Sequence, residues 1–253
     1  KGNDQVRLDV AINTLAPDLN IVGTARENEM SRDAAIDYAK KHGISIKQTL
    51  ESPYSTDENL WGRSVECGEL EDPWEEPPSD VWLWTAEPEA APDKPVIVEI
   101  GFKNGIPVSL DGEKMGTVEL VQHLSNLGGQ HGIGRVDMVE DRLVGIKSRE
   151  VYEAPAATIL ITAHKSLEQL TLSRSQIRMK EQIAQEYADL IYNGLWYSGH
   201  HRDLAAYTQS SQRDVTGQVR VKLWKGVLTI LGKQAEQSLY SKDPFDLYFR
   251  LLF

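Results

Sequence analysis

The periodicity of the sequence changes near residue 52, and this change predicts a chain built in two parts. Residues 1–50 alternate between helical segments and short apolar segments, an order that is typical of a parallel α/β unit. The remainder carries hairpin signals and long amphipathic segments, which indicate an α+β domain. We therefore predict an α/β piece at 1–50, an α+β domain at 51–240 and a C-terminal arm at 241–253.

The α/β piece is predicted to contain two helices and two strands. One helix runs from the polar start of the chain to Pro17, and the second covers 31–43, where a serine begins the helix and a glycine ends it. The apolar segments 20–25 and 44–48 are predicted to be buried strands.

The α+β domain contains two hairpin signals. The Asn-Gly pair at 104–105 lies between two apolar runs and adopts positive φ at low cost, while a Lys-Gly pair at 225–226 marks the second turn. The proline- and acid-rich stretch 70–95 is predicted to be an irregular connection that covers two of its own tryptophans. Residues 156–164 are compatible with either a strand or the start of a buried helix. Further helices are predicted over 116–129, 175–196 and 201–214.

Charge and cysteine content exclude several classes of protein. The formal charge of −11 argues against a nucleic-acid partner and against an anionic membrane surface, because both require a clustered basic face. No apolar run approaches the roughly 20 residues that cross a bilayer. A lone Cys67 excludes an internal disulfide framework and a cysteine zinc cluster, which fits the cytoplasm. The chain starts without an initiator Met or a signal peptide, so we expect further sequence upstream.

The segment SPYSTDENLWGRSVECGELEDP, residues 52–73, concentrates directional hydrogen-bonding groups beside a tryptophan. Ser55 and Glu58 have the spacing of a helix capping box, which is one interpretation of that pair. The other interpretation is that the segment binds something small and polar. A capping box leaves unexplained the further polar residues Asp57, Asn59, Arg63, Ser64 and Glu66.

The first helix carries Asn3, Asp4 and Arg7 within one turn. Asp4 and Arg7 have the i, i+3 spacing of a surface ion pair, which contributes roughly a few tenths of a kcal/mol. Alternatively, the free N–H groups of the helix start converge with the amide and the guanidinium to bind a carboxylate. The spacing alone favours the ion pair.

Three further features are compatible with simple structural roles. The segment GGQHGIGR at 128–135 lacks the Lys-Ser/Thr ending of a phosphate-binding loop, so we predict a glycine-stopped helix followed by a tight turn. Adjacent side chains diverge on a helix, so His200 and His201 are predicted to form a solvated first turn, and no metal site is expected. Residues 139–160 are too polar for a strand buried on both faces, so some of their side chains should line a cleft: Glu140, Arg142, Lys147, Arg149, Tyr152 and Glu153.

Four segments carry a resemblance to a known family: KGNDQVR, the 52–73 segment, HGIGRVDMVEDRLVGIKSREVYEAPAATIL, and SLYS near the end. In this order they resemble the argininosuccinate synthases, and the similarity covers most of the chain. The resemblance implies that 1–50 is the C-terminal remnant of a nucleotide-binding, ATP-pyrophosphatase-like α/β domain, and that 51–240 is an α+β synthetase domain. It implies a ligase of arginine biosynthesis that condenses citrulline with aspartate through a citrullyl-adenylate, with ATP converted to AMP and pyrophosphate.

The resemblance also assigns residues to the substrates. It implies that aspartate is held by Asn3 and Asp4, and Asp4 is the candidate group that accepts a proton from the aspartate amine. ATP is expected with Mg²⁺ as its counter-ion and without a prosthetic group, and the family's assembly implies a homotetramer with a swapped C-terminal helix. The citrulline contacts implied by the resemblance are Arg7, Ser55, Ser64, Glu140 and Tyr152.

One departure from the family bears directly on the reaction. The Ser-Gly-Gly-x-Asp-x-Ser pyrophosphate loop of the family's nucleotide-binding domain does not occur in the sequence. Either the chain is part of a complete enzyme, or it is a non-catalytic module that binds amino acids or acts as a scaffold. The residues that match the substrate sites favour the enzyme. Without the loop, the chain alone is expected to bind amino acids but not to hydrolyse ATP.

Overall fold

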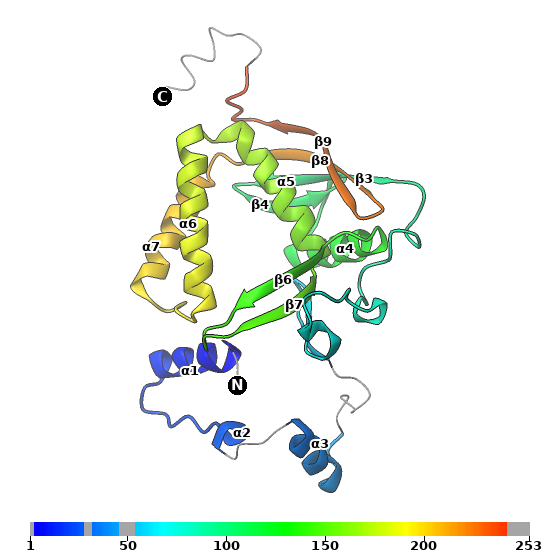
Figure 1. The fold of residues 1–253 in the computed structure, drawn as a ribbon. Coiled ribbons are helices and arrows are strands. Elements are labelled where there is room, and N and C mark those ends of the chain that lie inside the picture. The colour runs from blue at the N-terminus through cyan, green and yellow to red at the C-terminus, as the bar shows by residue number, and fades with distance from the viewer. Residues whose placement is uncertain (1–2, 28–31, 46–53, 242–253) are drawn as a thin grey trace.

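The computed structural model describes residues 3–27, 32–45 and 54–241 of the chain. Within these ranges, two antiparallel sheets lie among α-helices (Figure 1), which confirms the α+β character predicted for the larger part. The helices are α1 (Asn3–Leu15), α2 (Thr24–Glu27), α3 (Arg32–Lys41), α4 (Thr117–Gln130), α5 (Pro155–Thr171), α6 (Arg174–Tyr192) and α7 (Gly199–Ser211), with short 3₁₀ helices η1 (Gly68–Glu71) and η2 (Ser79–Val81). The strands are β1 (Ser55–Glu58), β2 (Arg63–Glu66), β3 (Val96–Lys103), β4 (Ile106–Leu110), β5 (Glu113–Lys114), β6 (Arg135–Asp141), β7 (Lys147–Glu153), β8 (Gly217–Trp224) and β9 (Val227–Ala235).

The larger, five-stranded sheet has the strand order β5-β4-β3-β8-β9. Asn104 and Gly105 connect β3 to β4 with φ angles of 50° and 77°. Lys225 and Gly226 connect β8 to β9 with φ angles of 45° and 80°. Two consecutive residues with positive φ match the twist of a tight hairpin, so both predicted turns are confirmed.

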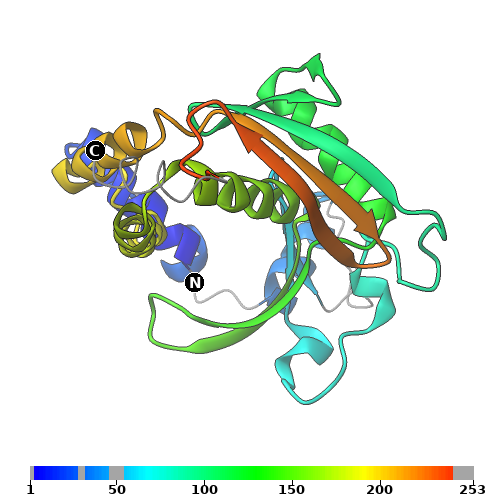
Figure 2. The same ribbon diagram turned by 90° about the horizontal axis from the view of Figure 1, so that it is seen from above.

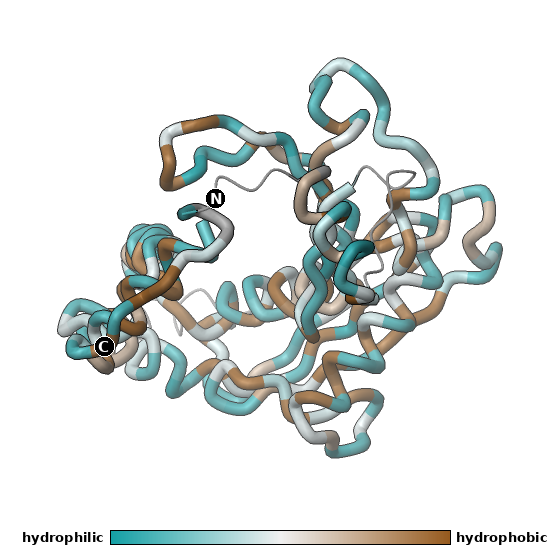
Figure 3. The backbone as a smooth tube through the Cα atoms, turned by 90° about the horizontal axis from the view of Figure 1, so that it is seen from below, coloured by the Kyte–Doolittle hydropathy of each residue, from teal (hydrophilic) through white to brown (hydrophobic). Residues whose placement is uncertain are grey.

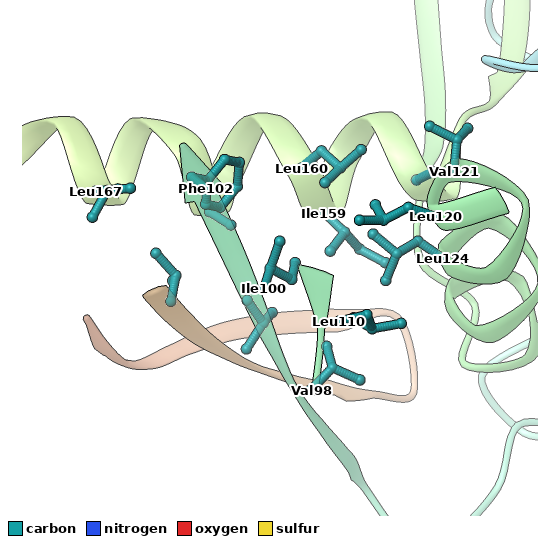
Figure 4. Close-up of a cluster of buried hydrophobic side chains, with 14 of the residues drawn as sticks. Val98, Ile100, Phe102, Leu110, Leu120, Val121, Leu124, Ile159, Leu160 and Leu167 are labelled. Atoms are coloured by element: carbon teal, nitrogen blue, oxygen red, sulfur yellow. The ribbon is translucent and has the colours of Figure 1, made fainter. Parts of the chain in front are cut away.

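The main hydrophobic core lies between this sheet and helices α4 and α5 (Figure 4). Ile100 of β3, Leu124 of α4 and Ile159 of α5 have no exposed surface. Burying a side chain of this size contributes roughly 1.5–3 kcal/mol, so this core supplies most of the non-directional stabilisation of the domain.

The undecided segment 156–164 is helical and belongs to α5. Pro155 opens the helix, where its lack of an N–H costs no hydrogen bond. One face of α5 is buried against the five-stranded sheet, which explains why the segment is apolar enough to suggest a strand.

The helix predicted at 116–129 is confirmed as α4, but the prediction that Gly128 and Gly129 end it is wrong. Gly128 and Gly129 lie inside the helix, which continues to Gln130. A Cβ on Gly129 would lie 2.1 Å from the carbonyl oxygen of Trp84, so a glycine is needed there for close packing. The tight turn after the helix is confirmed, since Gly132 and Gly134 both have positive φ.

The smaller, four-stranded sheet has the order β1-β2-β7-β6. One of its faces covers a small apolar cluster formed by Val65, Leu70, Val81 and Val151. The β6–β7 hairpin of this sheet curves away from the main core toward the start of α1 (Figure 2). In Figure 3, the strands of this hairpin include many hydrophilic residues, as expected for strands that are not buried on both faces.

The carboxylate of Glu153 attaches the irregular connection to the four-stranded sheet. Glu153 is 1% exposed and forms an ion pair with Arg63 at 2.8 Å. It also accepts the backbone N–H groups of Leu83, Trp84 and Thr85 at 3.0, 2.8 and 2.9 Å. The connection is therefore irregular, as predicted, and Glu153 holds its middle in one conformation. Arg63, Arg135 and Arg149 also donate to backbone carbonyls of the connection.

The prediction of a strand at 20–25 is wrong. Residues 20–23 have no regular structure, and Thr24 begins the short helix α2. The carboxylate of Glu27 accepts the backbone N–H of Gly23 at 3.1 Å, which caps this helix. Within the described residues before 46 there is no strand to pair with, so the side chain of Val22 stays 66% exposed.

Two other predictions concern strands. The capping-box interpretation of Ser55 and Glu58 is wrong, because both residues lie on β1 and are paired with β2. Of the strand predicted at 44–48, the first two residues are not in a strand, and 46–48 lie outside the described residues.

The predicted helices of the C-terminal half are confirmed as α6 and α7, which pack side by side. Ser173 and Gln176 form a capping box at the start of α6. None of the helices in the described part of the chain combines the length and the apolar character that crossing a bilayer requires. The arm predicted at 241–253 lies outside the described residues except for its first residue.

Candidate functional site

Four residues assigned by resemblance to citrulline lie on one face of the four-stranded sheet. Ser64 on β2 is paired directly with Tyr152 on β7. Ser55 on β1 is paired with the residue two positions after Ser64, and Glu140 on β6 is paired with the residue four positions before Tyr152. Directly opposite residues share a face, as do residues an even number apart along a strand. Six polar residues of this face form a group that we call the polar face: Ser55, Ser64, Glu66, Glu140, Glu150 and Tyr152.

The two serines of the polar face offer hydroxyl groups to a ligand. Neither Ser55 nor Ser64 forms a side-chain hydrogen bond to another residue in the described ranges, and both are partly exposed. A hydroxyl can donate one hydrogen bond and accept two, so the pair can bind either an N–H group or an oxygen.

Arg142, just after β6, lies among three carboxylates of the polar face. Its Nη2 contacts Glu66 and lies 2.8 Å from Oε1 of Glu150. Its Nε lies 3.8 Å from Oε2 of Glu140 and has no hydrogen-bond partner within the described ranges. One guanidinium cannot neutralise three carboxylates, so this arrangement favours retention of a proton on one of them.

The pKa values of Glu140 and Glu150 are shifted in opposite directions. Burial, together with the neighbouring charge of Glu150, raises the pKa of Glu140. Burial would also raise the pKa of Glu150, but hydrogen bonds from Tyr152 and Arg142 outweigh it and lower that pKa. Glu150 is therefore the ionised member of the pair, and Glu140 is the member that holds a proton more readily.

Tyr152 is directed toward Glu150 rather than into solvent. Its hydroxyl donates to Oε2 of Glu150 at 2.5 Å. Burial and the charge of Glu150 raise the pKa of Tyr152, so the phenol stays protonated.

Helix α1 reaches the polar face through Asn3. The amide nitrogen of Asn3 donates to Glu140 at 3.3 Å and to the hydroxyl of Tyr192 at 2.5 Å. Its amide oxygen accepts the backbone N–H of Leu143 at 2.9 Å. These bonds join the start of α1, the end of α6 and the β6–β7 hairpin, so a residue assigned to aspartate and one assigned to citrulline are in direct contact.

Arg7 is held at the C-terminal end of α6. Its Nε donates to the carbonyl oxygen of Tyr192 at 3.0 Å, and the guanidinium lies 4.9 Å from the centre of the Tyr192 ring. Gly194 allows this approach, because it has a φ of +76° and a Cβ there would lie 2.9 Å from Cα of Arg7. The charge of Arg7 also acts to lower the pKa of Glu140, against the larger effect of burial.

Asp4 is the predicted site residue with the least support from the geometry. Its carboxylate is 75% exposed and forms the i, i+3 ion pair with Arg7 at 2.6 Å that the spacing indicated. It lies next to Asn3 on α1 but forms no hydrogen bond with the polar face among the described residues.

Two models of one family match the sequence. A model described as "Arginosuccinate synthase C-terminal domain" matches residues 54–247, which is most of the chain. A model described as "Arginosuccinate synthase N-terminal HUP domain" matches residues 1–45. The chain belongs to the argininosuccinate synthase family. The predicted fold class, a short piece of a HUP domain joined to an α+β domain, is therefore confirmed.

Curated relatives are similar along almost the whole chain. The argininosuccinate synthase of Rubrobacter xylanophilus is 56% identical over 96% of this chain and 59% of its own length. That of Dehalococcoides mccartyi is 53% identical over 96% of this chain and 60% of its own. That of Chlorobium luteolum is 52% identical over 96% of this chain and 61% of its own. The chain thus spans about 60% of the length of the curated argininosuccinate synthases it matches.

Three residues of the polar face and its surroundings were not assigned a role from the sequence. Glu150 could have been found from the two-residue period of a strand, because it lies two positions before Tyr152. Arg142 was recognised only as one of several charges expected to line a cleft. No sequence pattern indicates a role for Tyr192, because its hydroxyl contacts Asn3, which lies 189 positions earlier in the chain.

The two adjacent histidines lie in the first turn of α7 and contact different groups. His200 lies 3.1 Å from a carboxylate oxygen of Glu186, and His201 lies 3.0 Å from the hydroxyl of Tyr187. Among residues 3–27, 32–45 and 54–241, no group of three His, Cys, Asp or Glu side chains is placed to hold a metal ion.

Proposed function

We propose that this chain supplies the citrulline-binding part of a protein that condenses citrulline with aspartate at the expense of ATP. The observation that carries the proposal is the gathering of Ser55, Ser64, Glu140 and Tyr152 on one face of a sheet, with Asn3 bonded to Glu140. Family membership supports the same reaction.

Citrulline has an α-ammonium and an α-carboxylate that need opposite partners. In the proposed complex, Glu140 binds the ammonium, and Arg7 with the start of α1 binds the carboxylate. The serines and Tyr152 supply hydrogen bonds for the remaining polar groups. The charged and hydrogen-bonding side chains of the polar face thus match an amino acid better than an apolar or polyanionic ligand.

The reaction requires positioning rather than a covalent intermediate with the protein. The ureido oxygen of citrulline attacks the α-phosphorus of ATP, pyrophosphate leaves, and the aspartate amine then displaces AMP from the adenylate. Aspartate is proposed to bind at Asn3 and Asp4, with Asp4 accepting the proton released by the amine. Holding both amino acids beside the activated carbon supplies most of the rate.

Further parts of the proposal come from the family alone. ATP is proposed to bind with Mg²⁺ as its counter-ion, on the nucleotide-binding domain of which 1–45 is a part. A cytoplasmic homotetramer is the proposed assembly.

The proposal is tested first by citrulline binding. Isothermal titration calorimetry should detect citrulline binding. Ser55→Ala should raise the Kd for citrulline about tenfold, the loss expected for one hydrogen bond. Thr56→Ala is the matched control, because Thr56 is the next residue of β1 and points to the opposite face. Equal losses in both variants, or no citrulline binding at all, would contradict the assignment.

Turnover separates the enzyme from the non-catalytic module. The protein expressed from its own gene should first have its intact mass compared with the 28.4 kDa of this chain. Pyrophosphate release that depends on citrulline, aspartate and ATP together supports the ligase. Citrulline binding without pyrophosphate release would instead support an amino-acid-binding module.

A further inference from the structure

The hydroxyl of Tyr152 has only one proton, and that proton is directed away from the ligand side. It is donated to Oε2 of Glu150 at 2.5 Å. A phenol whose O–H is already donated to one partner can offer other partners only the lone pairs of its oxygen. Tyr152 can therefore accept a hydrogen bond on the polar face but cannot donate one.

Glu150 keeps this hydrogen bond in one direction. Its other oxygen, Oε1, accepts from Nη2 of Arg142 at 2.8 Å, and the side chain is buried with 8% exposure. The pKa of Glu150 is lowered by its hydrogen bonds despite burial, so the carboxylate is ionised and can only accept. Reversing the Tyr152 bond would require a proton on Glu150, which Arg142 opposes.

We propose that Glu150 is a positioning residue that makes the hydroxyl of Tyr152 an obligatory acceptor, so that the polar face selects an N–H group of citrulline at this point. This inference rests on the proposed function and extends it to a residue that contacts no substrate itself. A ligand that offers a carboxylate or carbonyl oxygen at the same place would meet lone pairs and be disfavoured.

Replacing Glu150 by Gln tests the direction of the bond. The amide oxygen of Gln can still accept from Arg142, and its NH₂ group then donates to Tyr152, which frees the phenol proton to point at the ligand. We expect Glu150→Gln to raise the Kd for citrulline about tenfold, the loss expected for one hydrogen bond. The KM for citrulline should rise in parallel while kcat changes much less.

A double-mutant cycle distinguishes positioning from a merely structural role. Tyr152→Phe removes the hydroxyl, so adding Glu150→Gln to it should cause no further loss of citrulline affinity. If Glu150 merely supports the sheet, the two losses should add, and that result would overturn the inference. Thermal unfolding of each variant reports the structural contribution separately.

The pair formed by Tyr54 and Glu69 is a matched control. Here too a tyrosine hydroxyl donates to a glutamate, at 3.3 Å, but Tyr54 packs against the apolar cluster on the other face of the sheet. Glu69→Gln should leave citrulline affinity unchanged.

Two further results complete the test. If Glu150→Gln does not fold, Glu150→Asp replaces it in the test, because the shorter carboxylate can still only accept a hydrogen bond. A loss of citrulline affinity smaller than that of Tyr152→Phe supports the inference. An equal or larger loss overturns it. Absence of citrulline binding by the unsubstituted protein would contradict the proposed function itself. Normal binding that Glu150→Gln leaves unchanged would overturn only the role of Glu150.

Discussion

The two antiparallel sheets of this chain are stabilised by different kinds of interaction. The five-stranded sheet buries one face against α4 and α5 through aliphatic and aromatic side chains. The four-stranded sheet covers only a small apolar cluster and carries charged residues on both faces. Apolar packing has no directional requirement, whereas each charged group of the smaller sheet needs a specific partner.

The two sheets therefore differ in what they contribute: the larger one mainly stabilises the domain, and the smaller one carries polar groups that a ligand can bind. The faces of the smaller sheet also differ from each other: on one side Glu153 has a full set of protein partners, and on the other the serine hydroxyls have none in the described ranges. Groups already paired within the protein hold its shape, and groups with unused hydrogen-bonding capacity are those a ligand can bind.

Removing the carboxylate of Glu153 should have the largest effect on stability. Glu153→Ala leaves Arg63 buried, at 5% exposure, without its closest ion-pair partner, and leaves three backbone N–H groups without an acceptor. We expect a loss of about 4 kcal/mol in the free energy of unfolding, as for other broken buried ion pairs. Urea denaturation followed by circular dichroism measures this loss.

Glu89→Ala provides the comparison, because Glu89 is an exposed glutamate of the same irregular connection. Its expected effect is below about 0.5 kcal/mol. Similar losses in both variants would mean that Glu153 is not the residue that holds the connection in place.

A cavity in the main core should have the next largest effect. Leu124→Ala removes a fully buried side chain between α4 and the five-stranded sheet and should cost about 3 kcal/mol. Met138→Ala, on β6 of the smaller sheet, removes a side chain that is 42% exposed and should cost less than about 1 kcal/mol. If the two losses in urea denaturation were equal, the contrast between an apolar sheet and a polar sheet would be wrong.

The sequence predicted the elements whose local signals agree with their tertiary surroundings. The two hairpins followed from Asn104-Gly105 and Lys225-Gly226, because positive φ is required at those positions whatever packs around them. Helix α6 followed from its amphipathic period. The strand expected at 20–25 failed because two apolar residues define a strand only where another strand is available to pair with them.

The residues of the candidate site were proposed one by one, and the sequence did not indicate how they are arranged. Family resemblance selected Ser55, Ser64, Glu140 and Tyr152, but only the strand register shows that they share a face. The ion pair of Asp4 with Arg7 followed from i, i+3 spacing. Contacts such as Arg142 with Glu66 join residues 76 positions apart, and no local period encodes such a distance.

The raised pKa of Glu140 predicts how citrulline binding depends on pH. A bound ammonium favours the ionised carboxylate, so affinity should rise as the pH increases through the pKa of Glu140, which lies above the ordinary value of 4.5. Below that pKa the gain should approach tenfold per unit of pH, and above it the affinity should be constant. Titration calorimetry from about pH 5 to about pH 7 covers a range in which citrulline keeps both of its own charges.

Glu140→Gln should weaken citrulline binding about tenfold at neutral pH and remove this dependence. Asp137→Asn is the control on the same strand, because Asp137 lies three residues away, on the opposite face, and pairs with Arg149. A pH profile that persists in Glu140→Gln would assign the titration to another group near the site, such as Glu150.

The smallest effect is expected at the tip of the β6–β7 hairpin. Lys147 and Asp141 form an ion pair at 2.6 Å, but their side chains are 69% and 79% exposed. Water and salt screen such a pair, so Lys147→Gln should change the free energy of unfolding by less than about 0.5 kcal/mol.

The same hairpin contains Arg149, which is 7% exposed and donates to Asp137 and to the backbone carbonyls of Asp72 and Glu75. Arg149→Gln should therefore cost more than Lys147→Gln in parallel urea denaturation, and the reverse order would show that burial does not determine which charges stabilise the smaller sheet.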